Sequence, residues 1–117
     1  MINKKIALFA FNGDPLCFVH VLLNALDMHS KKYTVKVIIE GSATKLVKDL
    51  NDQTKPFASL YQKVKDLGLI DCVCKACSSK MGSIDAAYEQ NLRLGDDMSG
   101  HPGMSRYSDD GYMIITF

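Results

Sequence analysis

The chain has 117 residues, of which 47% are hydrophobic and 23% charged, and its formal net charge is +1 at pH 7. A chain of this length and hydrophobic content can bury a core without metal ions or disulfide bonds to hold it together. Its lysines are interspersed with acidic residues, which argues against nucleic acid or a membrane surface as a partner.

The chain begins with an apolar run, residues 6–11, that stops at the polar residues 12–15. This run is shorter than the core of a signal peptide, and no small-residue cleavage site follows it. We therefore expect a cytoplasmic protein, in which clustered cysteines are more often catalytic or metal-binding than paired in disulfides. A continuous apolar run of this length is typical of a strand covered on both faces, as in parallel sheets.

Asp14 and Pro15 predict the start of the first helix, Asp14 as its N-cap and Pro15 in its first turn. Leucine and valine residues then repeat at helical spacing to about Ser30. The β-branched stretch 33–40 predicts a second strand, and residues 43–50 have the pattern of a short helix. The chain so far consists of two strand-to-helix units.

Pro56 predicts the opening of another helix, which Gly68 ends. The remaining predicted elements are a third strand, a helix, a loop or short strand, a short helix and a closing strand, at residues 69–74, 83–91, 92–99, 100–110 and 112–117. Strands that alternate with helices predict an α/β protein with a parallel sheet between helix layers. Without repeats, low-complexity tracts or linkers, we expect one domain over residues 1–117.

In open α/β sheets the ligand site lies beyond the carboxyl ends of the strands, so loops that follow strands converge there. This rule selects the polar and cysteine residues that follow each predicted strand. They are Asn12, Asp14 and Cys17; Glu40 and Ser42; Cys74 and Cys77; and, above the fourth strand or its loop, Asp97 and His101.

Three of the four cysteines lie within residues 72–77. Cys72 is in the middle of the predicted strand, where a buried cysteine behaves as a small hydrophobic residue. Cys74 ends that strand, and Cys77 lies at the start of the next helix, where backbone N–H groups and the helix dipole favour a thiolate. We predict that one of Cys74 and Cys77 is a nucleophile and the other its resolving thiol; the alternative is two ordinary cytosolic thiols.

Cys17 and His20 are three residues apart on the first predicted helix. Cys17 either joins the site or is a small residue beside the sheet, and His20 is more typical of a solvated or subunit-contact histidine. Together with Cys74, Cys77 and either His20 or His101, Cys17 would satisfy the preference of zinc for sulfur and nitrogen ligands. No second C-x-x-C or His-x-His pair supports this set, so metal binding is the alternative hypothesis.

Glu40, at the end of its strand, either positions a substrate or accepts a proton, or it has a helix-capping or hydrogen-bonding role. His101 lies in a loop rich in glycine and proline. It is either an acid or base carried by a mobile lid, or a loop histidine with no such role. Residues 12–15 lack the glycines and lysine of a P-loop, and no G-x-G-x-x-G follows the first strand. We therefore expect no nucleotide cofactor.

Four segments carry a resemblance to a known family: residues 6–15, residues 37–42, Cys74 to Gly82, and the ending 111–117. Together they resemble the DsrE/DsrF-like family, which includes the TusD-type sulfur-relay proteins and the small YchN-like proteins. The resemblance implies a three-layer α/β/α sandwich with a mostly parallel five-stranded sheet. It also implies assembly into trimers or hexamers with cysteines near the subunit contacts.

In TusD-like members the sulfur-carrying cysteine ends the third strand, with a basic residue and a glycine behind it. Cys74 matches that position, with Lys80 and Gly82 following. Cys77 resembles the second cysteine of some YchN-like members and departs from single-cysteine carriers. Persulfide, disulfide and metal chemistry all remain open for the pair.

The leading hypothesis is a cytoplasmic sulfur-relay protein without a cofactor. Thiolate at Cys74 or Cys77 would take sulfane sulfur from a donor protein and pass it to an acceptor protein thiol. The alternatives are an oligomeric protein that binds zinc or another soft metal, and an assembly subunit whose thiols have no chemical role.

Overall fold

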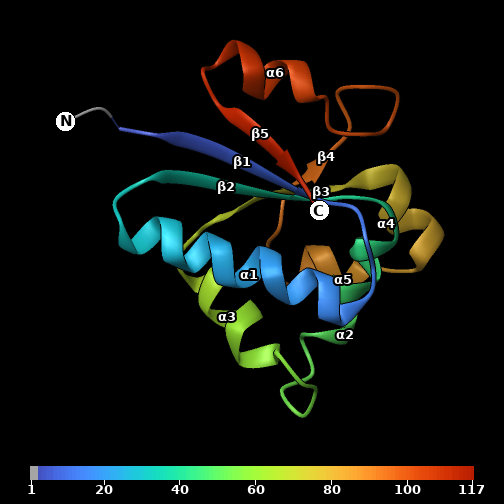
Figure 1. Cartoon of the computed structure of the whole chain (residues 1–117). Coiled ribbons are helices and arrows are strands. Elements are labelled where there is room, and N and C mark those ends of the chain that lie inside the picture. The colour runs from blue at the N-terminus through green and yellow to red at the C-terminus, as the bar shows by residue number, and fades with distance from the viewer. Residues whose placement is uncertain (1–2) are drawn as a thin grey trace.

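A computed structural model describes residues 3–117 of the chain (Figure 1). Its sheet has five strands in the order β4-β3-β2-β1-β5, and every neighbouring pair is parallel. The strands are β1 (Lys5–Ala10), β2 (Thr34–Ile39), β3 (Ile70–Cys74), β4 (Leu94–Gly95) and β5 (Met113–Thr116). The predicted, mostly parallel five-stranded sheet is confirmed and is parallel throughout.

Helices cover the two faces of this sheet unequally. α1, α2, α3 and α5 lie on one face, and α6 lies on the other (Figure 1). The helices are α1 (Pro15–Ser30), the 3-10 helix η1 (Gly41–Thr44), α2 (Lys45–Asp49), α3 (Ala58–Asp66), α4 (Lys75–Met81), α5 (Ile84–Glu89) and α6 (Met104–Asp109). The predicted α/β/α architecture is confirmed, with one thick and one thin helix layer.

The buried hydrophobic residues divide into two clusters, one on each face. The larger cluster joins Leu8, Val37 and Val73 of the central strands to the apolar faces of α1 and α3. The smaller one contains Ala7, Phe9, Ile38, Cys72, Tyr107 and Tyr112. Within it, the rings of Phe9 and Tyr107 meet edge to face with centroids 5.3 Å apart. Tyr107 is therefore the main anchor of α6 on the sheet.

The start of α1 follows the prediction closely. Asp14 is the N-cap, and its Oδ1 accepts a hydrogen bond from the Leu16 N–H at 2.9 Å. Pro15 is the first helical residue, where its lack of an N–H costs nothing because that donor would have no partner within the helix. The helix ends at Ser30, as predicted.

Three element boundaries differ from the sequence predictions. The helix predicted at 43–50 begins earlier, as η1, and becomes α2 only at Lys45. α3 begins at Ala58 rather than at Pro56, because Phe57 has a φ of +71° and is outside the helical region. The helix predicted at 100–110 is confined to α6, because residues 98–101 form a tight turn instead.

An irregularity in the pairing of β2 with β3 changes which side chains face α6. Val37 pairs with Ile70, but the next residue, Ile38, pairs with Cys72, so Asp71 is an extra residue in β3. A bulge of this kind interrupts the alternation of side chains between the two faces. Asp71 and Cys72 consequently both contact Tyr107 of α6, although they are neighbours in sequence.

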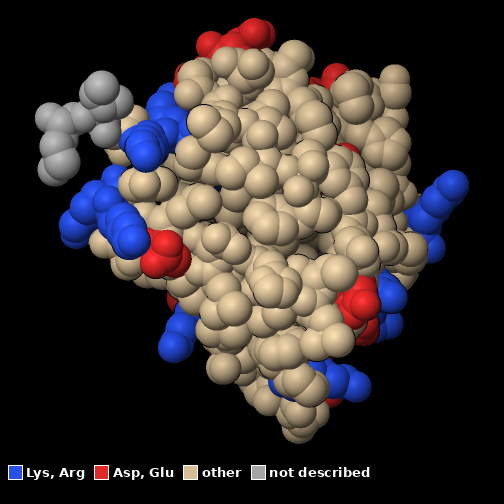
Figure 2. Space-filling view, in the orientation of Figure 1, with Lys and Arg blue, Asp and Glu red and all other residues tan. Residues whose placement is uncertain are grey.

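The face of the molecule seen in Figure 2 has few charged side chains at its centre, and the charged residues lie around its edge. α1 crosses this face in Figure 1 and exposes Leu16 and Leu23, at 67% and 47% of their full accessible area. Acidic and basic residues alternate along the edge rather than forming one basic patch. Within residues 3–117, no helix has the length and apolar character needed to cross a membrane.

Candidate functional site

Two thiols and one imidazole meet at the carboxyl end of β3. Cys74 is the last residue of β3, Cys77 is in the first turn of α4, and His101 is in the loop before α6. Their ligand atoms all lie within 4.8 Å of one another. The Nδ1 of His101 is 3.1 Å from the Cys74 Sγ and 3.7 Å from the Cys77 Sγ. A single ring nitrogen can thus exchange a proton with either thiol.

A tight turn positions His101. The N–H of Met98 donates to the His101 carbonyl at 2.7 Å, and the His101 N–H donates back to the Met98 carbonyl at 3.0 Å. The two residues between them, Ser99 and Gly100, have φ values of +50° and +88°, as the central residues of a type I′ turn do. The Ala76 N–H then donates to the Gly100 carbonyl at 2.9 Å, which ties the turn to α4.

Asp97 holds the other end of the same loop. Both of its carboxylate oxygens are 3.3 Å from the Gly103 N–H, which donates to them just before α6 begins. The loop that carries His101 is therefore attached to α4 on one side and closed on itself on the other.

Cys74 is completely buried, and its surroundings disfavour the thiolate. Burial raises the pKa of Cys74 to about 12, helped by hydrogen bonding with the Cys77 thiol and by the nearby Glu40 carboxylate. The Cys77 N–H, which donates to the Cys74 Sγ at 3.4 Å, acts in the opposite direction but is outweighed. Cys74 is a neutral thiol at rest, with His101 in place to accept its proton.

Cys77 differs from Cys74 mainly in its exposure. Its side chain is partly accessible to solvent, whereas that of Cys74 has no accessible surface. A thiol attacks only what can reach it, so Cys77 is the member of the pair that a molecule from solution can meet directly.

Glu40 lies at the end of β2, beside the end of β3, and only 5% of its surface is exposed. Burial, and then the negative charge of Asp97, raise the pKa of Glu40 to about 7. Its side chain makes no capping hydrogen bond to η1. Of the roles that the sequence left open for Glu40, the structure thus gives no support to helix capping and places a protonatable carboxyl next to the thiols.

The other two predicted site residues are apart from this cluster. Cys17 and His20 are both on α1, Cys17 partly buried and His20 exposed. Neither belongs to the cluster of Cys74, Cys77 and His101. Among residues 3–117, that cluster is the one group of three or more such side chains close enough together to hold a metal ion. Their role in binding stays a prediction. The cluster itself offers two sulfurs and one nitrogen, a donor set suited to a soft metal ion.

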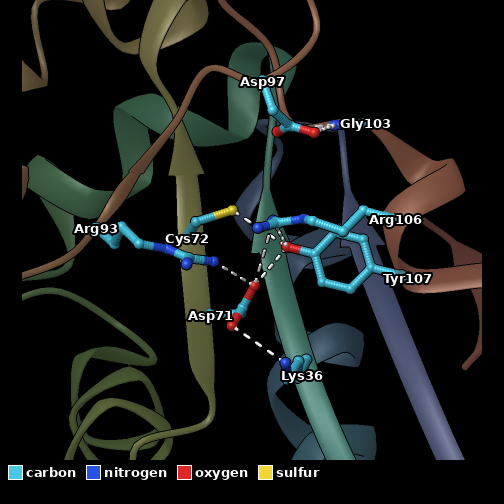
Figure 3. A network of polar contacts seen from close by, with 8 residues as sticks. All are labelled: Lys36, Asp71, Cys72, Arg93, Asp97, Gly103, Arg106 and Tyr107. Carbon is cyan, nitrogen blue, oxygen red and sulfur yellow. Dashed lines mark hydrogen bonds and ion pairs between the residues drawn. The ribbon is translucent and has the colours of Figure 1, made fainter. Parts of the chain in front are cut away.

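A second polar network, which the sequence analysis missed, surrounds Asp71 on the α6 side of the sheet (Figure 3). The Asp71 carboxylate accepts hydrogen bonds from the Tyr107 hydroxyl and, at 2.9 Å, from the Arg93 guanidinium. Lys36 and Arg106 complete the set, with nitrogens 3.6 and 3.8 Å from it. One carboxylate therefore neutralises part of the charge of three cations.

This Asp71 network also encloses Cys72. The Cys72 Sγ is 3.4 Å from the Tyr107 hydroxyl, and burial raises the pKa of this thiol. A Cβ on Gly95 would be 2.9 Å from that sulfur and 3.0 Å from Pro102, so β4 packs against Cys72 only because residue 95 is glycine. Cys72 is buried, as predicted. A charged residue inside the apolar β3 segment was the available sequence signal for the network, but its partners lie up to 36 residues away.

Comparison with known proteins gives the family of the chain. An uncharacterized protein of Methanocaldococcus jannaschii, MJ0733, is 38% identical over 97 residues, which are 83% of this chain and 77% of that protein. An uncharacterized protein of Archaeoglobus fulgidus is 43% identical over 44 residues, 38% of this chain and 72% of the relative. No solved structure matches significantly.

The sequence model of the DsrE/DsrF-like family matches residues 5–117, nearly the whole chain. Known members of this family act in sulfur relay, so the match supports a general role of that kind. On the strength of this match, the chain belongs to the DsrE/DsrF-like family.

Proposed function

We propose that the protein carries sulfane sulfur as a cysteine persulfide on the Cys74–Cys77 pair. The observation that carries this proposal is the meeting of two thiols and one imidazole nitrogen within 4.8 Å. Persulfide transfer needs a thiolate to attack a sulfur–sulfur bond and a group to take up its proton. Cys77 and His101 supply these two functions at the solvent-accessible side of the cluster.

In the loading step, the Cys77 sulfur attacks the outer sulfur of a donor persulfide. Its proton passes to the Nδ1 of His101, 3.7 Å away, in the tautomer that leaves this nitrogen free. The donor departs as a thiolate and takes that proton, and Cys77 is left as a persulfide. In the unloading step an acceptor thiolate attacks the outer sulfur, and Cys77 returns to its reduced form.

The family resemblance puts the carrier at Cys74, whereas exposure favours Cys77 as the thiol that meets donor and acceptor. Cys74 is fully buried, so neither protein can approach its sulfur in this conformation. We assign loading to Cys77, with Cys74 as the thiol behind it.

The test is mass spectrometry of reduced, metal-free protein after exposure to glutathione persulfide, followed by removal of the donor. Cys77→Ser abolishes sulfur uptake, while the control variant Ser79→Ala, which changes an exposed residue of α4 outside the cluster, leaves it unchanged. Uptake that persists in Cys77→Ser and disappears in Cys74→Ser reverses the assignment. If no variant and no wild-type protein gains sulfur, the carrier function is wrong.

The same cluster supports a second candidate function, the binding of a soft metal ion. Cys74, Cys77 and His101 supply three of the four ligands that a tetrahedral zinc ion takes. Titration of the reduced protein with Zn²⁺, read out by metal content after gel filtration, tests it. Stoichiometric zinc that is lost in His101→Asn and kept in Ser79→Ala, a change at an exposed position of α4, favours metal binding; no retained zinc excludes it.

The proposed partners are a sulfur-donor protein and a sulfur-acceptor protein. We also propose that the protein is cytoplasmic and forms a homo-oligomer. The exposed Leu16 and Leu23 of α1 support subunit contacts at this helix. Light scattering of the purified protein measures the subunit number, which we expect to be three or six.

A further inference from the structure

We propose that the Cys74–Cys77 pair also reduces sulfane sulfur to hydrosulfide and closes to a disulfide as it does so. This inference rests on the proposed function, since it starts from the persulfide on Cys77. It adds a second fate for that persulfide, which does not require an acceptor protein.

The two thiols are close together but unequally exposed. Cys77 is partly exposed and Cys74 has no exposed surface, yet their sulfur atoms lie within 4.8 Å of each other. An external donor or acceptor cannot reach Cys74. The electrophilic sulfur that Cys74 does meet is that of Cys77 once Cys77 is loaded.

His101 provides a proton path for Cys74. The Cys74 Sγ is 3.1 Å from the His101 Nδ1, closer than Cys77 is to the same nitrogen. When Cys77 carries a persulfide, its own Sγ no longer bears a proton, so the ring nitrogen can take up the proton of the closer Cys74 thiol instead. His101 thus acts on the two thiols in turn.

The step balances within the site. Cys74 gives its proton to His101 and attacks the Sγ of Cys77, forming the Cys74–Cys77 bond. The bond between Cys77 Sγ and the sulfane sulfur breaks, and hydrosulfide leaves with the bonding pair and takes the proton from His101. Each cysteine sulfur is oxidised by one electron and the sulfane sulfur is reduced by two. An external dithiol reductant restores the pair.

Attack on the inner sulfur is favoured over passing the outer sulfur to Cys74. A persulfide on Cys74 would add an atom at a fully buried position that no acceptor can reach. A disulfide adds no atom and requires only that the two sulfurs close to about 2 Å.

The experiment loads reduced, metal-free protein with glutathione persulfide, removes the donor without reductant, and follows sulfide release and the mass of the protein. Wild-type protein releases one equivalent of sulfide per loaded protomer and ends two hydrogens lighter than the reduced form, with the disulfide mapped to Cys74 and Cys77. Cys74→Ser keeps the added sulfur on Cys77 and releases no sulfide. Ser79→Ala, a control at an exposed position of α4 outside the cluster, behaves as the wild type does.

The outcomes separate this inference from the carrier function. If wild-type protein and Cys74→Ser hold sulfur equally long, the reduction does not occur and the carrier function stands. If neither gains sulfur, both proposals fail. Cys74→Ala serves as a second variant where Cys74→Ser does not fold, and sulfide release from a folded Cys74→Ala protein at the wild-type rate overturns the inference.

Discussion

Cys72 and Cys74 are two residues apart on one strand, and both are completely buried. Burial raises the pKa of both thiols. Yet Cys72 is enclosed by the tyrosine and aspartate that hold α6 to the sheet, whereas Cys74 faces an imidazole and a second thiol that reaches solvent. Exposure and pKa alone do not identify a reactive cysteine in this protein; the groups around the sulfur do.

The largest expected effect is a difference in alkylation between Cys77 and Cys72. With iodoacetamide and native protein, Cys77 reacts readily, while Cys72 reacts only when the sheet opens, at least ~1000-fold more slowly for a typical domain stability. Peptide mapping over time measures both rates in one sample. Labelling of Cys72 on the time scale of Cys77 would contradict the enclosed environment described here.

The next largest effect is on stability, through Asp71. Asp71→Ala leaves the Tyr107 hydroxyl and three cations without their shared partner, and we expect a loss of about 3 kcal/mol in the free energy of unfolding. The matched control is Asp96→Ala, which removes an exposed pair with Lys75 at 3.7 Å and costs less than about 0.5 kcal/mol. Urea denaturation compares the two; equal losses would show that the Asp71 network does not hold α6 to the sheet.

His101→Asn sharpens the comparison at the site itself. Without the imidazole, both thiols lose the ring nitrogen that lies 3.1 and 3.7 Å from their sulfurs, so sulfur uptake at pH 7 falls by roughly 100-fold, the contribution typical of a general base. The folded stability changes little, because His101 is in a loop and partly exposed. Uptake kinetics with glutathione persulfide provide the measurement. An unchanged rate in a folded variant would exclude His101 as the proton acceptor.

The smallest expected effect is a pH dependence from Glu40, whose pKa is raised from 4.5 to about 7 by burial and by Asp97. Because the folded state binds this proton more tightly than the unfolded state, its contribution to stability is complete below pH 4.5 and is lost as the pH rises through about 7. Between pH 5 and 8 we expect a decrease of about 1–2 kcal/mol.

Glu40→Gln removes this decrease, because the amide stays neutral throughout. Urea denaturation of both proteins at several pH values provides the comparison. A slope that is the same in Glu40→Gln and in wild type would assign the pH dependence to another group.

The elements of the fold with local causes could be predicted from sequence. Asp14 and Pro15 specify the start of α1 because a cap and a first-turn proline act within a few residues. The convergence of Cys74, Cys77 and His101 also followed from sequence, because the carboxyl ends of parallel strands meet at one edge.

Features that depend on distant partners could not be predicted. Asp71 is an extra residue only because of the register in which β3 pairs with β2. Its contribution to stability depends on its hydrogen bond with Tyr107, 36 residues later. Likewise, the left-handed Phe57 delays α3 although Pro56 is a good first residue for a helix. The burial of Cys74 could not be predicted either, because the loop that carries Gly100 and His101 contacts its sulfur from a later part of the chain.

The order of these groups along the chain has a consequence for synthesis. Cys74 and Cys77 leave the ribosome before His101, and the loop of His101 is joined to the sheet through β4, a strand of only two residues. Until that short strand pairs with β3, the two thiols lack their imidazole and behave as ordinary cysteines. For the proposed sulfur carrier, a growing or half-folded chain would therefore be a poor sulfur acceptor, and only molecules that have finished folding would be loaded.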